Sequence, residues 1–532
     1  MKKSSKITII TLFALLFFAG TGLVINNFAN AQSFSSPTID LFKKFNRVIE
    51  LVRFYYVEEV DWKEAFEGAI SGMLEKLDPH SVYIPEKELK RSNENFSGKY
   101  EGIGIYYDVL DGAVLVVSPI AGSPAEEVGL MAGDKIIEIE GESTIGLSRD
   151  DVPAKLKGPK GSKVRVKIVR DGLEEPFEVT ITRDVIPINT VTTAFMFDEE
   201  TAYIFVNRFA ETTSLEVEQK LREFEAKGMK RLILDLRGNP GGYLLEAVKL
   251  AGKFLPDKKL IVYTKNRGGA TGEEYFSDFR REGPYRNIPL IVLVDRGSAS
   301  ASEIVAGAIQ DHDRGLVLGT RTFGKGLVQR QFDLNDNSAV RITIAKYYTP
   351  SGRCIQRPYK GLNNEKYYLE TMTDTSQSSI DSSEVFYTAM KRKVYGGGGI
   401  IPDVIIPYKS FSKARKLTQK LSAKRMFFEF ASYFSHKKKL NYKSIDQFHK
   451  NFDVNPEILH LFENYLQSQE FEYNKEEFDK DKEYLSKMIK AEVARILFGS
   501  EAYYEILMRY DNQVIAALSH FSEAKKFAQR YK

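Results

Sequence analysis

A cluster of serines at the start of a predicted helix could supply a nucleophile. Residues 294–311 read VDRGSASASEIVAGAIQD, in which a predicted strand ends, Gly297 provides a turn and an alanine-rich helix begins. A serine at such a turn lies beside the unpaired N–H groups of the first helical turn, which can stabilise a developing oxyanion. The same position also suits a serine that only caps the helix. The residues alone do not choose among Ser298, Ser300 and Ser302.

A lysine further along the chain could act as the matching base. Lys325 lies between two glycines in the segment GLVLGTRTFGKGLVQ, residues 315–329. A Ser/Lys dyad needs a neutral amine to accept the hydroxyl proton, so the pKa of the lysine, about 10.4 when free, must fall to roughly 7. Burial away from water and from anions has that effect, at a cost of about 4 kcal/mol. The alternative is an ordinary solvated lysine.

The same segment resembles a phosphate-binding loop without completing one. Its residues Gly319–Gly326 read GTRTFGKG. A P-loop ends in Ser or Thr, which binds magnesium, and is followed by a helix. Here the last position is Gly326, and the following QRQFDLND predicts a turn. Nucleotide binding is therefore the less favoured alternative.

A third segment offers backbone donors. Residues 235–252 read DLRGNPGGYLLEAVKLAG and place the turn NPGG between a predicted strand and a predicted helix. Glycines let backbone N–H groups approach a substrate closely. A plain strand-to-helix connection is the alternative.

The pattern of hydrophobic residues divides the chain into regions that must position these segments. Continuous apolar strands alternating with amphipathic helices over 186–407 predict a buried, largely parallel sheet. The other regions are a targeting segment (1–31), a helical N-terminal region (32–97), short strands with Gly and Pro turns (98–185), and helices rich in Lys, Phe and Tyr (408–532).

The N-terminus is typical of a signal peptide. Three lysines precede the apolar run 7–20, and Ala29-Asn30-Ala31 fits a cleavage site. The apolar character persists to Ile25, so an uncleaved anchor over 7–25 is the alternative. Either reading predicts an exported protein of the periplasm or cell envelope.

Composition excludes several other classes of protein. A net charge of +4, from 76 basic and 72 acidic residues, gives no reason to expect a nucleic-acid partner. The lone Cys354 cannot form an internal disulfide, and neither a cysteine cluster nor an HExxH motif suggests a metal. We therefore expect no metal and no cofactor.

Taken in order, LDLRGNPGG, SASASEI and TFGKGLVQ resemble the C-terminal processing peptidases, also called tail-specific proteases. The flanking segments LDPHSVYI (77–84), AKYYTPSGRCI (345–355) and GIIPDVII (399–406) agree, so the resemblance covers roughly residues 40–407. It implies a multidomain α/β protein. The peptidase core would be a mainly parallel-sheet, ClpP/crotonase-like fold, with an inserted β-rich PDZ-like domain and helical N-terminal and C-terminal regions.

The resemblance also assigns roles to residues. The family's nucleophile is the middle serine of SASAS, which is Ser300, and its general base is Lys325. Gln329 matches the glutamine that orients the lysine. The oxyanion donors correspond to the N–H groups of Gly242 and Ala301.

The PDZ-like domain is expected to read the substrate. Gly102, Ile103, Gly104 and Ile105 resemble the family's carboxylate-binding loop, whose N–H groups hold a chain-terminal carboxylate while the peptide adds as a strand. The resemblance thus predicts a serine endopeptidase acting through an acyl-enzyme on envelope proteins with free C-termini. An inactive PDZ scaffold is the alternative. The C-terminal extension is expected to pack on the core or form a homo-oligomer; docking of an adaptor protein is a further alternative.

Overall fold

The computed structural model describes residues 36–110, 112–170, 172–278, 285–362, 364–373, 384–410 and 412–531. The chain divides into two units, Met1–Met73 and Leu74–Lys532. The expected signal peptide, 1–31, lies outside the described residues. Within them, every helix is too short or too polar to cross a membrane.

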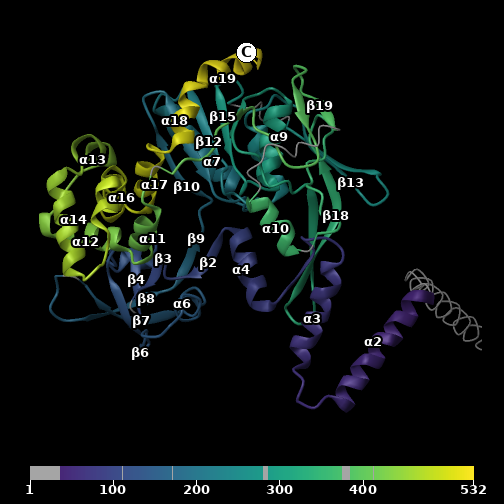
Figure 1. Ribbon diagram of the computed structural model, residues 1–532, viewed down its shortest axis with the longest axis horizontal. Helices are drawn as coiled ribbons and strands as arrows, with labels where there is room; N and C mark the ends of the chain where they lie inside the picture. Colours follow the sequence, from purple (N-terminus) through teal and green to yellow (C-terminus); the bar gives the residue numbers. More distant parts are fainter. Residues whose placement is uncertain are drawn as a thin grey trace, which may run out of the picture. The chain divides into compact units, whose positions relative to one another are not determined.

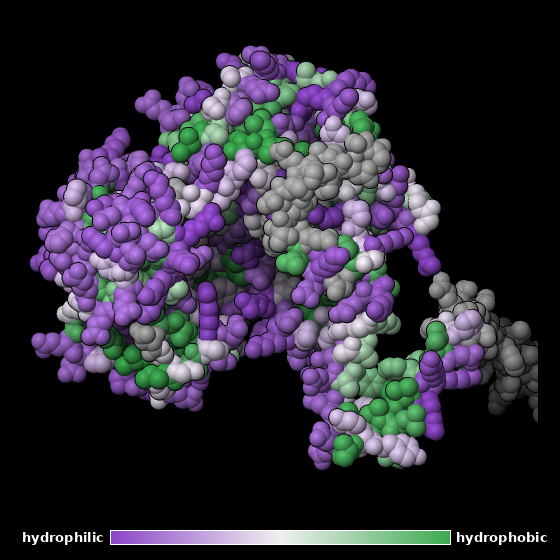
Figure 2. All heavy atoms as spheres, viewed as in Figure 1, coloured by the Kyte–Doolittle hydropathy of each residue, from purple (hydrophilic) through white to green (hydrophobic). Residues whose placement is uncertain are grey.

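The N-terminal unit is helical, as the sequence predicts. It contains α2 (Ser36–Tyr55) and most of α3 (Trp62–Glu75), and the Phe45 and Phe66 rings meet edge to face with centroids 6.4 Å apart. The apolar side chains of α2 are nevertheless largely exposed, with Leu41 at 65% and Tyr55 at 81% (Figure 2).

The region predicted to be a peptidase core, 186–407, is built on a mainly parallel sheet, and the predicted fold class is confirmed. Its strands follow the order β10-β11-β12-β15-β16-β21, and only the β10–β11 pair is antiparallel among the described strands. Runs such as RLILD and LIVLV are buried on both faces, which explains why they read as continuously apolar. The strands are β10 (Val191–Met196), β11 (Thr201–Val206), β12 (Arg231–Asp235), β15 (Leu290–Val294), β16 (Leu316–Gly319) and β21 (Val404–Ile405).

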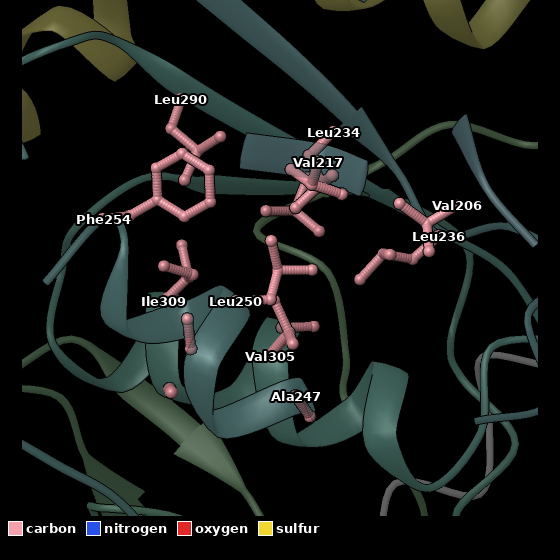
Figure 3. Packing of buried hydrophobic residues seen from close by; sticks show 14 of the residues in the cluster. Val206, Val217, Leu234, Leu236, Ala247, Leu250, Phe254, Leu290, Val305 and Ile309 are labelled. Atoms are coloured by element: carbon pink, nitrogen blue, oxygen red, sulfur yellow. The ribbon is translucent and has the colours of Figure 1, made fainter. Parts of the chain in front are cut away.

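Helices cover both faces of this sheet. On one face lie α7 (Thr213–Ala226), α8 (Leu244–Gly252) and α9 (Ala301–Asp311). Figure 3 shows Leu234 of β12 above Leu250 of α8 and Val305 of α9, all fully buried. The other face packs against α18 (Asn512–Ser519) and α19 (Phe521–Ala528) from the end of the chain (Figure 1).

A second, antiparallel sheet carries the lysine segment. Its order is β1-β18-β13-β14, with β17 paired to the other edge of β18. The segment LIVYTKN, expected among the parallel strands, forms β13 of this sheet, because an apolar run does not disclose its partner. The bounds are β1 (Val82–Ile84), β13 (Leu260–Lys265), β14 (Thr271–Phe276), β17 (Leu327–Asp333) and β18 (Ala339–Tyr348). Nearby lie α4 (Glu86–Ser97), α10 (Asn364–Thr373), β19 (Val385–Tyr387) and β20 (Lys393–Tyr395).

The β-rich domain has its own sheet and core. The sheet order is β3-β4-β5-β7-β8, with β6 paired to β5, and a ribbon of β2 and β9 leads in and out. Its elements are β2 (Lys99–Gly102), β3 (Ile105–Leu110), β4 (Ala113–Pro119), α5 (Pro124–Glu127), β5 (Lys135–Ile139), β6 (Glu142–Ser143), α6 (Val152–Leu156), β7 (Lys163–Val169), β8 (Phe177–Thr182) and β9 (Asp184–Pro187).

The C-terminal helices pack on both other domains. Phe428 is 1% exposed against Leu115 and Val117 of β4, and Arg425 pairs with Asp108 of β3 at 2.5 Å. Their own core is rich in phenylalanine. The helices are α11 (Arg415–Ala423), α12 (Met426–Lys438), α13 (Ile445–Asn451), α14 (Pro456–Ser468), α15 (Lys475–Lys480), α16 (Lys482–Phe498) and α17 (Ser500–Met508), and a 3-10 turn, Gln529–Tyr531, follows α19.

Candidate active site

Ser300 lies at the N-terminus of α9 in a strained conformation. Its φ of 53° is in the left-handed region, which is uncommon for a residue with a side chain and costs about 1–3 kcal/mol. Its N–H donates to Glu303 Oε2 at 2.8 Å, and its carbonyl accepts from the N–H groups of Glu303 and Ile304. These bonds hold the turn, and Ser300 lines a cavity of about 1360 Å³.

The other two serines of the cluster have structural roles. Ser298 Oγ donates to Leu236 O at 2.8 Å, and Ser302 Oγ donates to Asn239 O at 2.9 Å. Both side chains are fully buried, whereas Ser300 is half-buried and faces the cavity. The tertiary contacts therefore separate three hydroxyls that the sequence pattern left equivalent.

Lys325 lines the same cavity. It lies in the turn between β16 and β17, and burial, reinforced by the positive charge of Arg341, lowers the pKa of its amine from 10.5 to about 8. Asp78 and Glu303 act in the opposite direction. The amine is therefore easier to deprotonate than a solvated lysine by about 3 kcal/mol.

Gln329, four residues on, binds the amine of the lysine. Lys325 Nζ donates to Gln329 Oε1 at 2.7 Å, and Gln329 Nε2 donates to the carbonyl of His80, which belongs to the LDPHSVYI segment. Among the described residues no hydrogen bond joins Lys325 Nζ to Ser300 Oγ.

Two buried residues tie the serine turn to the lysine turn. Glu303 accepts from the N–H groups of Ser300, Gly324 and Lys325 at 2.8–2.9 Å and from Thr322 Oγ1 at 2.6 Å. Burial raises the pKa of this carboxyl. The Tyr347 hydroxyl lies 2.6 Å from the carbonyl of Lys325 and 3.1 Å from that of Ser300.

Unused backbone donors lie beside the serine. Within the described residues, no acceptor is bound by the N–H of Gly242 or of Ala301. A Cβ on the adjacent Gly241 would lie 2.8 Å from Ser300 Cβ and 2.9 Å from Ala301 N, so the NPGG turn packs directly on the serine turn. Gly242 itself has φ +147° and leaves no room for a side chain, since a Cβ would lie 1.9 Å from Phe209 O. The pair could receive an oxyanion.

The loop Gly102–Ile105 has the features of a carboxylate site. Ile103 and Ile105 are buried in the domain core, and the N–H groups of Ile103 and Gly104 have no acceptor in the described part of the chain. Gly104 has φ +83° and packs against Ser123, which donates to its carbonyl. The loop leads into β3, which lies at the edge of its sheet and could accept a peptide strand.

The geometry argues against the phosphate-binding alternative. The strand β17, rather than a helix, follows Gly326, and the N–H of Gly326 donates to Gln356 Oε1 at 2.9 Å. The donors of Gly324 and Lys325 are occupied by Glu303. A phosphate would therefore find these N–H groups already bound.

Sequence reasoning missed three residues of this site. Glu303 follows Ser300 by three positions, and this S-x-x-E spacing is the signal of a capping box. Tyr347 and His80 lie inside segments that mark the family resemblance, but nothing in the residue pattern discloses what their side chains touch.

Comparison with known proteins agrees with the geometry. The family model described as peptidase family S41 matches residues 200–364, a PDZ domain model matches 115–170, and the activating protease CtpB N-terminal domain matches 21–88. A family of unknown function matches residues 417–499, within the C-terminal helices.

Curated relatives span most of the chain. The carboxy-terminal processing protease CtpA of Bacillus subtilis is 32% identical over 441 residues, covering 79% of this chain and 92% of CtpA. CtpB of the same organism is 37% identical over 332 residues, covering 62% and 68%. Among solved structures, the photosystem II D1 C-terminal processing protease is 29% identical with a TM-score of 0.35, covering 67% of this chain and 86% of its own.

The fold, the PDZ domain and these matches define a serine-type peptidase that binds peptide substrates. The similarity to CtpA extends over nearly the whole length of that protein. The chain belongs to the carboxy-terminal processing proteases of peptidase family S41.

Proposed function

We propose that this peptidase cleaves exported proteins through a Ser300/Lys325 dyad. The observation that carries the proposal is that a strained serine and a lysine with a pKa of about 8 line one cavity. The family membership supplies the reaction, hydrolysis of a peptide bond near a C-terminus.

In the acylation step the neutral Lys325 amine accepts the proton of the Ser300 hydroxyl as Oγ attacks the scissile carbonyl. Gln329 keeps one amine hydrogen engaged, so that the lone pair can turn toward the serine. The resulting oxyanion lies between the N–H groups of Gly242 and Ala301. The ammonium then protonates the leaving amine as the carbon–nitrogen bond breaks, which leaves an acyl-enzyme.

Water completes the cycle. Lys325, neutral again, takes a proton from the attacking water and returns it to Ser300 Oγ as the ester C–O bond breaks, so that the acid product leaves and both residues are restored. The PDZ loop Gly102–Ile105 holds the substrate's terminal carboxylate on free N–H groups, while the peptide pairs with the edge of β3. The N-terminal segment directs the protein to the cell envelope.

The test compares hydrolysis of casein by wild type and by Ser300→Ala and Lys325→Ala variants. We expect both variants to lose activity by at least about 1000-fold, because removal of a nucleophile or its base leaves only residual catalysis. Ser302→Ala is the matched control, since this nearby hydroxyl is buried on Asn239 O, and it should stay active. Undiminished hydrolysis in either dyad variant would refute the dyad, whereas absence of hydrolysis in wild type would favour the inactive PDZ scaffold.

A further inference from the structure

Two arginines on the wall of the catalytic cavity are hydrogen-bonded by neutral side chains. Arg208 and Arg341 both line the cavity and are both half-buried. In the described part of the chain no ion pair joins either guanidinium to a carboxylate. Burial lowers the pKa of both side chains, so each charge is held there at a cost in solvation.

One helix orients both arginines. Arg208 Nη1 donates to Asn95 Oδ1 at 2.7 Å, and Arg341 Nη2 donates to Ser92 Oγ at 3.2 Å. Ser92 and Asn95 lie three residues apart on α4, so they are neighbours on one helix face. The two guanidiniums therefore approach adjacent points of the same wall.

The neutral side chains that bind the two arginines leave several guanidinium N–H donors without an acceptor among the described residues. Within the described residues, Nη2 of Arg208 and both Nε and Nη1 of Arg341 have no acceptor, and these planar groups match the geometry of a carboxylate. The charge of Glu216 opposes the effect of burial on the pKa of Arg208, but the Glu216 carboxylate is bound by the N–H groups of Thr190 and Val191 and by the Thr212 hydroxyl. Glu246 is paired with Lys249 at 2.5 Å, and Glu211 is exposed.

Arg341 lies near the dyad, since its charge contributes to the lowered pKa of Lys325. Arg341 Nη2 also donates to Gln331 Oε1 at 3.2 Å, and Gln331 follows Gln329 by two residues on β17, so both lie on one face of the strand. Two residues of extended chain span about 6.6 Å. An extended substrate would cover this distance with the same number of residues.

We propose that Arg208 and Arg341 form a carboxylate subsite that selects substrates carrying a negative charge about two residues from the scissile bond. The proposal rests on Ser300 being the nucleophile of this cavity. The carboxylate could be the C-terminus of the substrate or an Asp or Glu side chain, since both present the same pair of oxygens to a guanidinium fork.

The experiment uses short peptides that span a cleavage site mapped in casein. The two peptides of the first pair end two residues after the cleaved bond, one as a free acid and the other as an amide. The two peptides of the second pair both end as amides, and they carry either Glu or Gln within two residues of the cleaved bond. Rates are measured at pH 9, where Lys325 is mostly neutral, so that changes in its pKa do not enter the ratio. We expect wild type to favour the charged member of at least one pair by roughly 10- to 100-fold in kcat/KM. A preference within the acid/amide pair would assign the carboxylate to the C-terminus of the substrate, and a preference within the Glu/Gln pair would assign it to a side chain.

Substitutions of the two arginines test whether these residues cause the preference for charged substrates. Arg341→Gln and Arg208→Gln should each bring the charged/neutral ratio toward 1, and Arg341→Lys should retain part of it, because the charge stays while the fork is lost. Lys249→Met is the control, since Glu246 already neutralises that lysine, and it should keep the wild-type ratio.

Ratios near 1 for both pairs in wild type would overturn the proposal, and so would an unchanged ratio in both glutamine variants. Loss of all cleavage in Ser300→Ala tests the dyad separately from these ratios.

Discussion

The pKa of Lys325 makes a quantitative prediction about activity. A pKa of about 8 leaves about 9% of the amine neutral at pH 7 and about 91% at pH 9. If the neutral amine is the base, kcat/KM should rise about tenfold per pH unit below 8 and level off above 9. With the ordinary lysine pKa of 10.5, the neutral fraction at pH 7 would be about 0.03%, or roughly 300-fold smaller.

Changing Arg341 should move this profile in a known direction. The Arg341 charge lowers the pKa of Lys325, so Arg341→Gln should raise that pKa and shift the rise in kcat/KM to higher pH. Lys325→Arg should be inactive at every pH, because a guanidinium stays protonated.

The assay is the initial rate of cleavage of a quenched fluorescent peptide from pH 5.5 to 10, with Ser300→Ala as the blank. A rise still centred near 10.5 in wild type would refute the reasoning, as would a profile that stays flat from pH 6 to 9. A wild-type profile that does not move in Arg341→Gln would show that this charge is screened from the amine.

Three further predictions concern stability and backbone geometry. Lys325→Met should raise the free energy of unfolding at pH 7 by up to about 3 kcal/mol, because the folded state holds the protonated amine less well than the unfolded chain does. The gain is full below pH 8, the folded pKa, and vanishes as the pH rises to 10.5, the unfolded pKa. Urea unfolding below pH 8 and near pH 10.5 measures the difference. Gly242→Ala should abolish casein hydrolysis, because a side chain at φ +147° would overlap a facing carbonyl; normal activity would contradict the tight turn. Asp511→Ala should cost about 3 kcal/mol, because it removes both oxygens that accept from Nη1 of the buried Arg237, while the exposed Asp479→Ala should cost less than about 1 kcal/mol. Equal midpoints for the last two variants in chemical unfolding would remove the role assigned to Asp511.

The Arg237 network shows why the C-terminal extension is part of the fold. Arg237 lies in the LDLRGNPGG segment and pairs with Asp235, with Asp511 and with the Gln513 side chain. The final helices also bury Phe521 against the core sheet. Packing on the core, one of the two roles expected for the extension, is therefore present in the structure, although lysine-rich helices with scattered aromatics do not reveal which surface they cover.

The PDZ-like domain illustrates a different limit of sequence reasoning. Short strands separated by Gly and Pro turns predict a small β-rich domain, and the family resemblance implies that Gly102–Ile105 is its carboxylate-binding loop. The contact of Phe428 with Leu115 could not be read in the same way, since those residues are more than 300 positions apart.

The sequence by itself predicts the features that depend on local residue types. It determined the strand-to-helix turns, the glycine-flanked lysine, the alternation that makes a parallel sheet, and, through the family resemblance, the expectation that Ser300 and Lys325 act together. These features depend on residue type and short spacing, which the chain states directly.

Only the tertiary structure decided the properties that depend on surroundings. It directed the hydroxyls of Ser298 and Ser302 to backbone carbonyls, left Ser300 on the cavity, and buried Lys325 so that its pKa fell. It also brought Arg208 and Arg341 to one helix face from opposite sides of the dyad in sequence. The physical reason is that solvation and charge–charge interaction are set by distances in space, which residue spacing along the chain does not fix.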